Sequence, residues 1–178
     1  ELVDRGDFDA IVMGRPFLAD PDVVNKAEAG KASTIRPCVG CNAKCLDMAM
    51  ASKPIGCIGN YECNREEELE DENGLMPTEK KSEHPEKILV IGAGPSGMEF
   101  ARVAALRGHK VTIWEKRNRT IGLSLYAATP PRRYDIRYFG QWLERTCREL
   151  GVEIILNKEA TAENIIAASK DYDRVVLA

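Results

Sequence analysis

The sequence has few aromatic residues, two histidines and no long apolar run. Aromatic residues make up 6% of the 178 positions. Every apolar run stays far below the ~20 residues that span a bilayer, and the first residues lack the charged stretch and apolar core of a secretion signal. These absences predict a cytoplasmic protein that does not enter a membrane. With only two histidines, neither in a suggestive setting, the sequence also argues against a serine hydrolase.

The charges are nearly balanced. The chain carries 25 Lys and Arg against 28 Asp and Glu, a formal net charge of −3. Because the basic residues are scattered among acids, there is no basic stripe to hold a phosphate backbone, and nucleic acid is excluded as a partner. An apolar content of 44% over 178 residues suffices for the core of one domain, or of one domain with an appendage.

Six cysteines in a chain without a secretion signal indicate metal or redox chemistry instead of disulfides. Four of them are spaced C-x2-C-x3-C-x11-C, at positions Cys38, Cys41, Cys45 and Cys57. Three close thiolates plus a more distant fourth can bind the four irons of a cubane cluster. Structural zinc sites more often use two separated pairs. The spacing therefore favours a [4Fe–4S] cluster as the metal centre, with zinc or plain structural thiols as the alternatives.

The surroundings of these cysteines and the two remaining thiols support this interpretation. Gly40 and Gly56 lie beside ligands and Asn42 tolerates left-handed backbone, and these features support a close wrap of the loop around sulfur. Cys147 lies inside a helical pattern and is expected in the core. Cys63 is expected to be an incidental exposed thiol, with a competing role as ligand left open.

A glycine motif follows at Gly92-Ala-Gly94-Pro95-Ser96-Gly97. It comes directly after an apolar strand and opens a helix, and Glu115 closes the next strand about twenty residues on, as in the dinucleotide-binding fingerprint. The glycines allow a tight turn, close approach of a pyrophosphate and packing of helix on strand, while the helix N-terminus attracts the anion. A carboxylate at Glu115 should accept hydrogen bonds from ribose and disfavour a 2′-phosphate, so FAD or NAD is preferred over NADP here.

Apolar periodicity predicts an α/β organisation. Strands are expected at residues 8–14, 87–91, 110–114, 152–156 and 173–178, with helices at 20–29, 95–107 and 137–150. Residues 66–85, rich in Glu and followed by Pro and Lys, read as a solvated linker. Because strand 8–14 stands alone and 173–178 ends abruptly, both termini look like truncations, and residues 1–178 expressed by themselves are expected to be unstable.

Four segments together resemble the bacterial 2,4-dienoyl-CoA reductase and trimethylamine dehydrogenase family. They begin at Gly14, Ile35, Lys87 and Thr129, and they read GRPFLADP, IRPCVGCN, KILVIGAGPSG and TPP. The resemblance implies four parts: residues 1–35 as the end of an FMN-binding (β/α)8 barrel, 36–65 as the iron–sulfur loop, 66–85 as the acidic linker, and 86–178 as the start of a Rossmann-like FAD-binding domain. It further implies that NAD(P)H binds outside these residues.

The resemblance also assigns roles to single residues. Gly14 and Arg15 would hold the FMN phosphate at the carboxyl end of the last barrel strand. In the FAD site it adds Lys116, Gly122 and the backbone of Ala160 to the glycine motif. One departure is that the family commonly has Gly-Gly-Gln where this chain has Ile121-Gly122-Leu123.

The implied activity is an electron relay from NAD(P)H through FAD and the cluster to FMN, which reduces the C=C bond of an enoyl-CoA or related unsaturated acid. A small-molecule substrate and the nicotinamide are the expected partners. The alternatives are an oxidative amine demethylase of the same family and an electron-transfer subunit like that of glutamate synthase. No catalytic residue is assigned, because in the family such residues lie on other barrel strands. The oligomeric state is left open.

Overall fold

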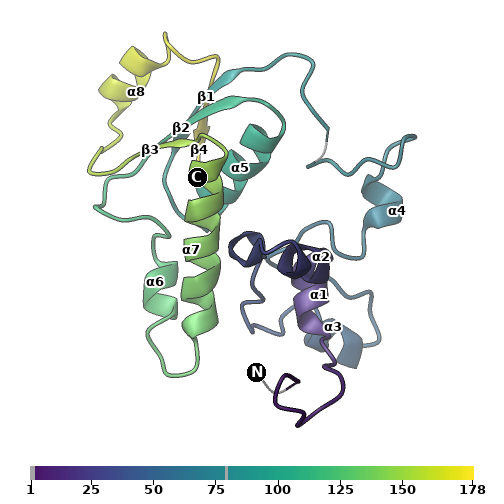
Figure 1. Ribbon diagram of the computed structural model, residues 1–178. Coiled ribbons are helices and arrows are strands. Elements are labelled where there is room, and N and C mark those ends of the chain that lie inside the picture. The colour runs from purple at the N-terminus through teal and green to yellow at the C-terminus, as the bar shows by residue number, and fades with distance from the viewer. Residues whose placement is uncertain (1–2, 79) are drawn as a thin grey trace. The chain divides into compact units, whose positions relative to one another are not determined.

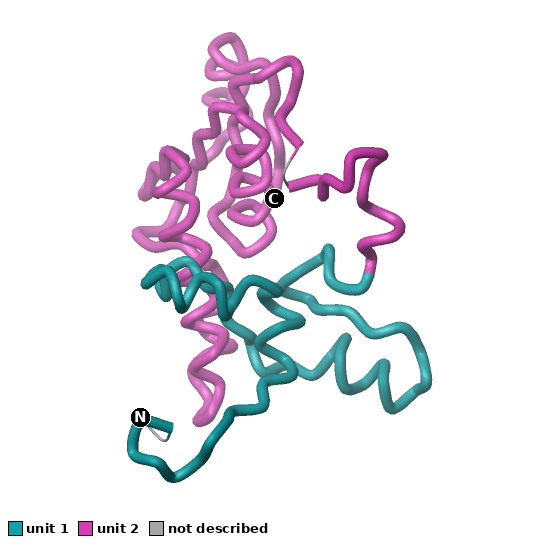
Figure 2. The backbone as a smooth tube through the Cα atoms, turned by 45° about the vertical axis from the view of Figure 1, so that its right-hand side comes forward, with its two compact units in different colours: residues 1–64 teal, residues 65–178 magenta. Residues whose placement is uncertain are grey.

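The computed structural model describes residues 3–78 and 80–178. The chain divides into two compact units, residues 1–64 and 65–178, which Figure 2 shows in different colours. The second unit contains the parallel sheet and the longer helices, whereas the first contains short helices joined by loops. The cysteine motif and the glycine motif therefore lie in different units.

The second unit is built on a four-stranded parallel sheet. Its strands are β1 (Lys87–Ile91), β2 (Lys110–Trp114), β3 (Glu153–Ile155) and β4 (Arg174–Leu177), in the order β3-β2-β1-β4. The predicted strands at 87–91 and 110–114 are confirmed with identical bounds, and β3 and β4 lie inside the predicted ranges. Because the strand order reverses at β1, the sheet has a switch point between β1 and β4, where α/β proteins bind their ligands.

Two helices cover one face of this sheet (Figure 1). Helix α5 (Pro95–Leu106) packs on β2, and α7 (Tyr134–Glu149) packs along α5. The short helices α4 (Glu66–Leu69), α6 (Ser124–Ala127) and α8 (Ala162–Ala168) complete the unit. The core between helices and sheet is contiguous and consists of Ile88, Val90, Ala93, Met98, Ala101, Ala104, Val111, Ile113, Trp142, Leu143, Cys147 and Val152.

The loop after β2 is anchored against α7 by Ile121. Its backbone has a φ of 72°, a left-handed conformation that is strained for a β-branched residue. Its amide donates to the carbonyl of Ala93 at 2.7 Å, which ties the loop to the glycine motif. Its side chain, 6% exposed, fills the space above Gly140 in α7. Ile121 belongs to the segment that departs from the family's Gly-Gly-Gln, and its side chain fits because residue 140 of α7 is a glycine.

We expect Gly140→Ala to destabilise the folded chain by about 1–3 kcal/mol, the usual cost of overpacking. A Cβ at position 140 would stand 2.5 to 2.9 Å from three side-chain carbons of Ile121. In an Ile121→Gly background the same substitution should cost nothing, because the obstructing side chain is gone. Urea unfolding of both single variants and the double variant measures this coupling. Additive free energies of unfolding would contradict the contact.

The first unit contains helices α1 (Arg15–Ala19), α2 (Val23–Glu28) and α3 (Leu46–Met50) and a 3-10 turn, η1 (Ala32–Thr34). The strand predicted at 8–14 is wrong for this structure, since residues 8–14 form none. A strand needs a neighbour to accept its backbone hydrogen bonds, and none of the described residues pairs with this segment. Its apolar side chains are exposed, up to 98% at Val12.

Helix α2 also begins later than predicted. Asp22, not Asp20, occupies the N-cap position, and Asp20 ends the preceding helix α1. The carboxylate of Asp20 is buried at 3% exposure and accepts hydrogen bonds from the amides of Asp22 and Arg36 and from Lys26 Nζ. A residue expected to start one helix therefore joins several segments of the first unit.

Candidate functional site

A pocket of about 530 Å³ lies at the carboxyl ends of the strands in the second unit. Ile91, Trp114 and Ala178 line it from the ends of β1, β2 and β4. It therefore occupies the edge of the sheet at which α/β proteins bind nucleotides. Its other lining residues are Gly92, Gly94, Pro95, Glu115, Lys116, Arg117, Gly122, Leu123, Ser124, Lys158, Glu159 and Ala160.

The three glycines of the motif have different roles in this pocket. Gly92 has a φ of 108°, and a Cβ there would collide with the carbonyl of Ala178. A Cβ on Gly97 would collide with the carbonyl of Gly92 and press on Val90, so this glycine lets α5 pack against β1. Nothing lies within 4 Å of a Cβ built on Gly94. The space at Gly94 is therefore open to a ligand, and the protein itself does not need it.

Helix α5 begins beside this open space. Gly94 is its N-cap residue and provides no side-chain cap, and Pro95 in the first turn has no amide to satisfy. The amide of Met98 donates to the Gly94 carbonyl at 3.0 Å. The amides of Ser96 and Gly97 precede this bond, so they lie in the first turn at the N-terminal end of the helix. Free amides and the helix dipole favour an anion such as a pyrophosphate at this position.

Glu115 lies at the end of β2 and is buried, with 7% of its surface exposed. Its two carboxylate oxygens accept hydrogen bonds from the amides of Ala93 and Arg117, each at 2.9 Å. The carboxylate thus holds the glycine turn and the loop after β2 together. A carboxylate oxygen has two acceptor sites, so Glu115 can still accept hydrogen bonds from ribose hydroxyls.

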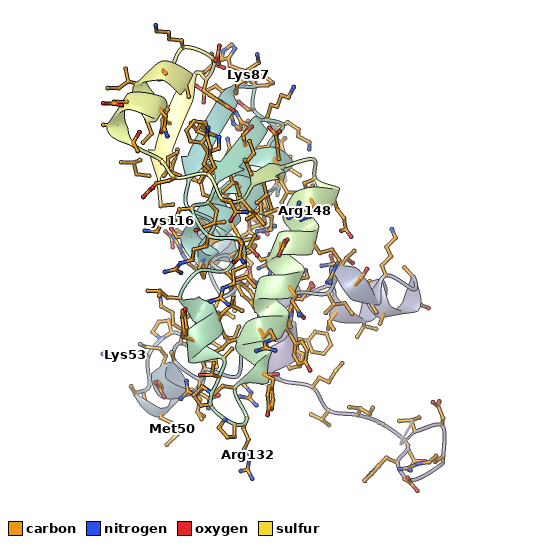
Figure 3. All side chains as sticks on the ribbon, turned by 90° about the vertical axis from the view of Figure 1, so that its left-hand side faces the viewer. Met50, Lys53, Lys87, Lys116, Arg132 and Arg148 are labelled. Carbon is orange, nitrogen blue, oxygen red and sulfur yellow. The ribbon has the colours of Figure 1, made fainter. Side chains whose placement is uncertain are left out.

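Lys158 is a pocket residue that the sequence did not reveal. Its amide donates to the Glu115 carbonyl at 2.8 Å, and its ammonium lies 4.8 Å from the centre of the Trp114 ring. Such a cation–π contact orders a side chain that is otherwise mobile. Lys158 follows β3, and the carboxyl ends of parallel strands lie at one edge of a sheet. The predicted strand at 152–156 could therefore have indicated that Lys158 lies near the glycine motif. Figure 3 shows Lys116 at this edge and Lys87 at the opposite one.

All four cysteines of the motif line one small pocket in the first unit, together with Leu18, Val39 and Ile58. The amide of Gly56 donates to the carbonyl of Lys44 at 3.0 Å, which brings the segments before Cys57 and Cys45 side by side. The Gly40 amide donates to Cys38 Sγ at 3.4 Å. Gly40 and Asn42 have φ values of 65° and 59°, as the close wrap requires.

The four thiols surround one pocket, and a cluster and a single zinc ion would demand different sulfur positions there. Within residues 3–78 and 80–178, no group of three or more His, Cys, Asp or Glu side chains is placed so that it could hold a metal ion. A zinc site needs four sulfurs converging at ~2.3 Å from one point. A four-iron cluster binds one thiolate at each of four corners. The four thiols that line this pocket are candidate donors for a metal centre.

Gly14 and Arg15 lie at the start of α1, beside a cavity of about 580 Å³. Leu18, Leu46, Ala49 and Ile55 make most of its wall apolar, and Asn42 and Cys45 complete it. The guanidinium of Arg15 donates to Asn42 Oδ1 at 2.7 Å. Arg15 also lines the cysteine pocket, so it lies between the cavity and the four thiols.

The two remaining cysteines are both buried. Cys63 has 6% of its surface exposed, so the prediction of an exposed thiol is wrong. It is one of the few buried apolar residues of the first unit, with Ala19 and Val23. Cys147 is fully buried and donates to the Met98 carbonyl at 3.2 Å. Burial raises the pKa of the Cys147 thiol to about 12, so it stays neutral at pH 7 and is no nucleophile.

Comparison with known proteins places this chain among flavin-dependent oxidoreductases. The family model described as pyridine nucleotide-disulphide oxidoreductase matches residues 38–178. A metal reductase from Desulforamulus reducens is 48% identical over 179 residues, 99% of this chain and 26% of that protein. A cinnamate reductase from Clostridium sporogenes is 40% identical over 175 residues, 97% of this chain and 24% of that protein.

Similarity extends to amine-oxidising enzymes and to a solved structure. A dimethylamine dehydrogenase from Hyphomicrobium sp. is 33% identical over 162 residues, 89% of this chain and 20% of that protein. The structure of a 2-naphthoyl-CoA reductase complex superposes with a TM-score of 0.88 at 34% identity, covering 99% of this chain and 26% of that one.

The chain spans about a quarter of the length of the metal reductase, the cinnamate reductase and the 2-naphthoyl-CoA reductase. No helix in the described part of the chain is both long and apolar enough to cross a membrane. The glycine motif, the parallel sheet and the similarity over nearly all of the chain agree with one another. This chain belongs to the pyridine nucleotide-disulphide oxidoreductases and, among them, to the 2,4-dienoyl-CoA reductase and trimethylamine dehydrogenase family.

Proposed function

We propose that this chain is the electron-relay part of an NAD(P)H-dependent flavoenzyme that reduces the C=C bond of an α,β-unsaturated acid or its thioester. The observation that carries the proposal is the presence, in one chain, of a dinucleotide pocket and a pocket lined by four cysteines. The substrate class is supported by similarity to a cinnamate reductase and a 2-naphthoyl-CoA reductase.

Residues of the second unit bind FAD in this proposal. The first turn of α5 receives the pyrophosphate at the open space beside Gly94, and Glu115 accepts hydrogen bonds from the ribose. Loop residue Gly122 and the segment up to Ala160 form the remaining walls. The FAD that these residues would hold would supply hydride acceptance from a nicotinamide and one-electron transfer onward.

Residues of the first unit hold the acceptors. Cys38, Cys41, Cys45 and Cys57 ligate a [4Fe–4S] cluster, and Gly14 and Arg15 bind the phosphate of FMN. The position of Arg15 in the walls of both the apolar cavity and the cysteine pocket supports a short distance between these two centres. A cluster is needed in such a chain because separated flavins cannot exchange a hydride directly.

The activity is tested on the full-length enzyme, purified without oxygen. With NADH or NADPH as donor, we expect cinnamate or an aromatic enoyl thioester to be reduced in a one-to-one ratio to the nicotinamide consumed. Chromatography identifies and quantifies the saturated product. The competing function is oxidative demethylation, which the similarity to a dimethylamine dehydrogenase supports. Turnover of dimethylamine with an artificial acceptor, and none of the unsaturated acids, would decide for that alternative.

We expect Glu115→Gln to weaken FAD binding by about 1–3 kcal/mol, roughly a 5- to 150-fold rise in Kd. The amide keeps one acceptor oxygen but presents its NH2 group to a backbone amide that now donates to the carboxylate. Iron and FMN should stay at the wild-type level. Flavins are released with acid and separated by chromatography, with Glu163→Gln on the exposed start of α8 as control. Loss of FMN with full retention of FAD would reverse our assignment of the two flavins.

A further inference from the structure

The two ends of the cysteine segment are joined by side chains that are not cysteines. Arg36 precedes Cys38 by two positions, and its Nη1 donates to the carbonyl of Gly59 at 3.2 Å, two positions after Cys57. The next residue, Asn60, donates from Nδ2 to the carbonyl of Leu18 in α1 at 3.1 Å. Both ends of the segment are thereby attached near the end of the same short helix.

A buried carboxylate completes this attachment. Asp20 Oδ2 accepts from the backbone amide of Arg36 at 2.7 Å, and the same carboxylate pairs with Lys26 Nζ at 2.7 Å. Asp20 and Asn60 are 3% and 4% exposed. A carboxylate and an amide are buried at this level only when hydrogen bonds replace their water. The residues Asp20, Arg36 and Asn60, here named the loop-end clamp, therefore form a fixed polar arrangement.

This polar arrangement stands in for an apolar core. In the described part of the first unit, the buried apolar residues are Ala19, Val23 and Cys63, whereas the second unit has a large contiguous core. The hydrogen bonds of the clamp connect Asp20 to the Arg36 amide, Arg36 to the Gly59 carbonyl and Asn60 to the Leu18 carbonyl. These hydrogen bonds join the two ends of the loop from Cys38 to Cys57 through groups other than the cysteine thiols.

We propose that the loop-end clamp pre-organises the cysteine loop by fixing its two ends before iron arrives, and that it helps to retain iron afterwards. Asp20, Arg36 and Asn60 are positioning residues for the metal site and touch no metal themselves. Holding the loop ends together removes the entropy of loop closure from the binding step. The inference rests on the proposed function to the extent that the cysteines hold a cluster.

The first experiment needs neither iron nor substitution. In the full-length protein stripped of metal, hydrogen exchange is measured at the amides of Arg36 and Gly56, which donate to Asp20 and Lys44. We expect both amides to be protected at least 10-fold relative to unstructured peptide. Free exchange at Arg36 in the metal-free protein would overturn the clamp, whatever metal the cysteines bind.

The second experiment measures iron retention in Asn60→Ala and Asp20→Asn. Each removes part of the clamp and leaves all six cysteines, and release of iron to an anaerobic chelator should be at least 10-fold faster than in wild type. Asn25→Ala is the matched control, because the exposed side chain of Asn25 donates to Asp22 at the N-cap of α2 and does not belong to the clamp. FAD content, which depends on the other unit, should not change. Iron release as slow as in the control would contradict the proposal.

The two experiments separate this inference from the proposed function. A wild-type protein that binds zinc or no metal, but whose Arg36 amide is protected, would refute the cluster and leave the clamp supported. A wild-type protein with four irons and an unprotected Arg36 amide would support the cluster and refute the clamp.

Discussion

Gly94→Val should abolish FAD retention in a chain that still folds. The backbone at position 94 has φ −74° and ψ 174°, which any residue can adopt. Beyond its chain neighbours, no protein atom lies within 4 Å of a Cβ there, so we expect the branched side chain to enter the space left for a ligand. Because the pyrophosphate must approach this backbone, we expect Kd for FAD to rise at least 100-fold, about 3 kcal/mol.

Gly97→Ala is the matched comparison, since it should fail for the opposite reason. Its Cβ would collide with the carbonyl of Gly92 and stand 3.2 Å from Val90 Cγ1, so α5 must move away from β1. Thermal unfolding is compared with that of metal-loaded, FAD-depleted wild type. The Tm should be lower for Gly97→Ala and unchanged for Gly94→Val in the same state. Flavin release by acid then gives the FAD content of each. Full FAD in Gly94→Val would disprove the placement of the pyrophosphate.

Cys41→Ser should eliminate nearly all bound iron. Wild-type enzyme prepared without oxygen is expected to contain about four irons and four sulfides per chain, since a cubane needs one thiolate at each iron. Cys41 is the most exposed of the four thiols that line the cysteine pocket, so its loss leaves the surrounding packing intact. Iron and acid-labile sulfide are measured on the same samples. Zinc in place of iron would sink the cluster assignment.

Cys63→Ala is the control for this experiment, and its expected result follows from burial. Cys63 packs in the interior and lies outside the walls of the cysteine pocket. Replacing it should lower stability slightly, as loss of one buried sulfur does, and leave iron unchanged. Equal iron loss in Cys41→Ser and Cys63→Ala would show that the fourth ligand is wrongly assigned.

Local sequence patterns determined the parts of this chain in which neighbouring residues decide the structure. Strands β1 and β2 are continuous apolar runs, and the glycine motif between β1 and α5 restricts the turn to one geometry, so their bounds were predictable. The four cysteines were recognisable as one site from spacing alone. The similarity to known oxidoreductases agrees with these local signals.

Contacts between residues far apart in the chain were decided only by the tertiary structure. Asp20 has the pattern of a helix N-cap, yet the amide of Arg36, sixteen positions on, is among its donors. Ile121 adopts a left-handed backbone because Gly140, in another helix, leaves room for its side chain. Lys158 enters the pocket because β3, which precedes it, ends at the same edge of the sheet as β1, β2 and β4. In each case, the stabilising partner lies beyond the reach of any local pattern, so periodicity and spacing carry no signal for it.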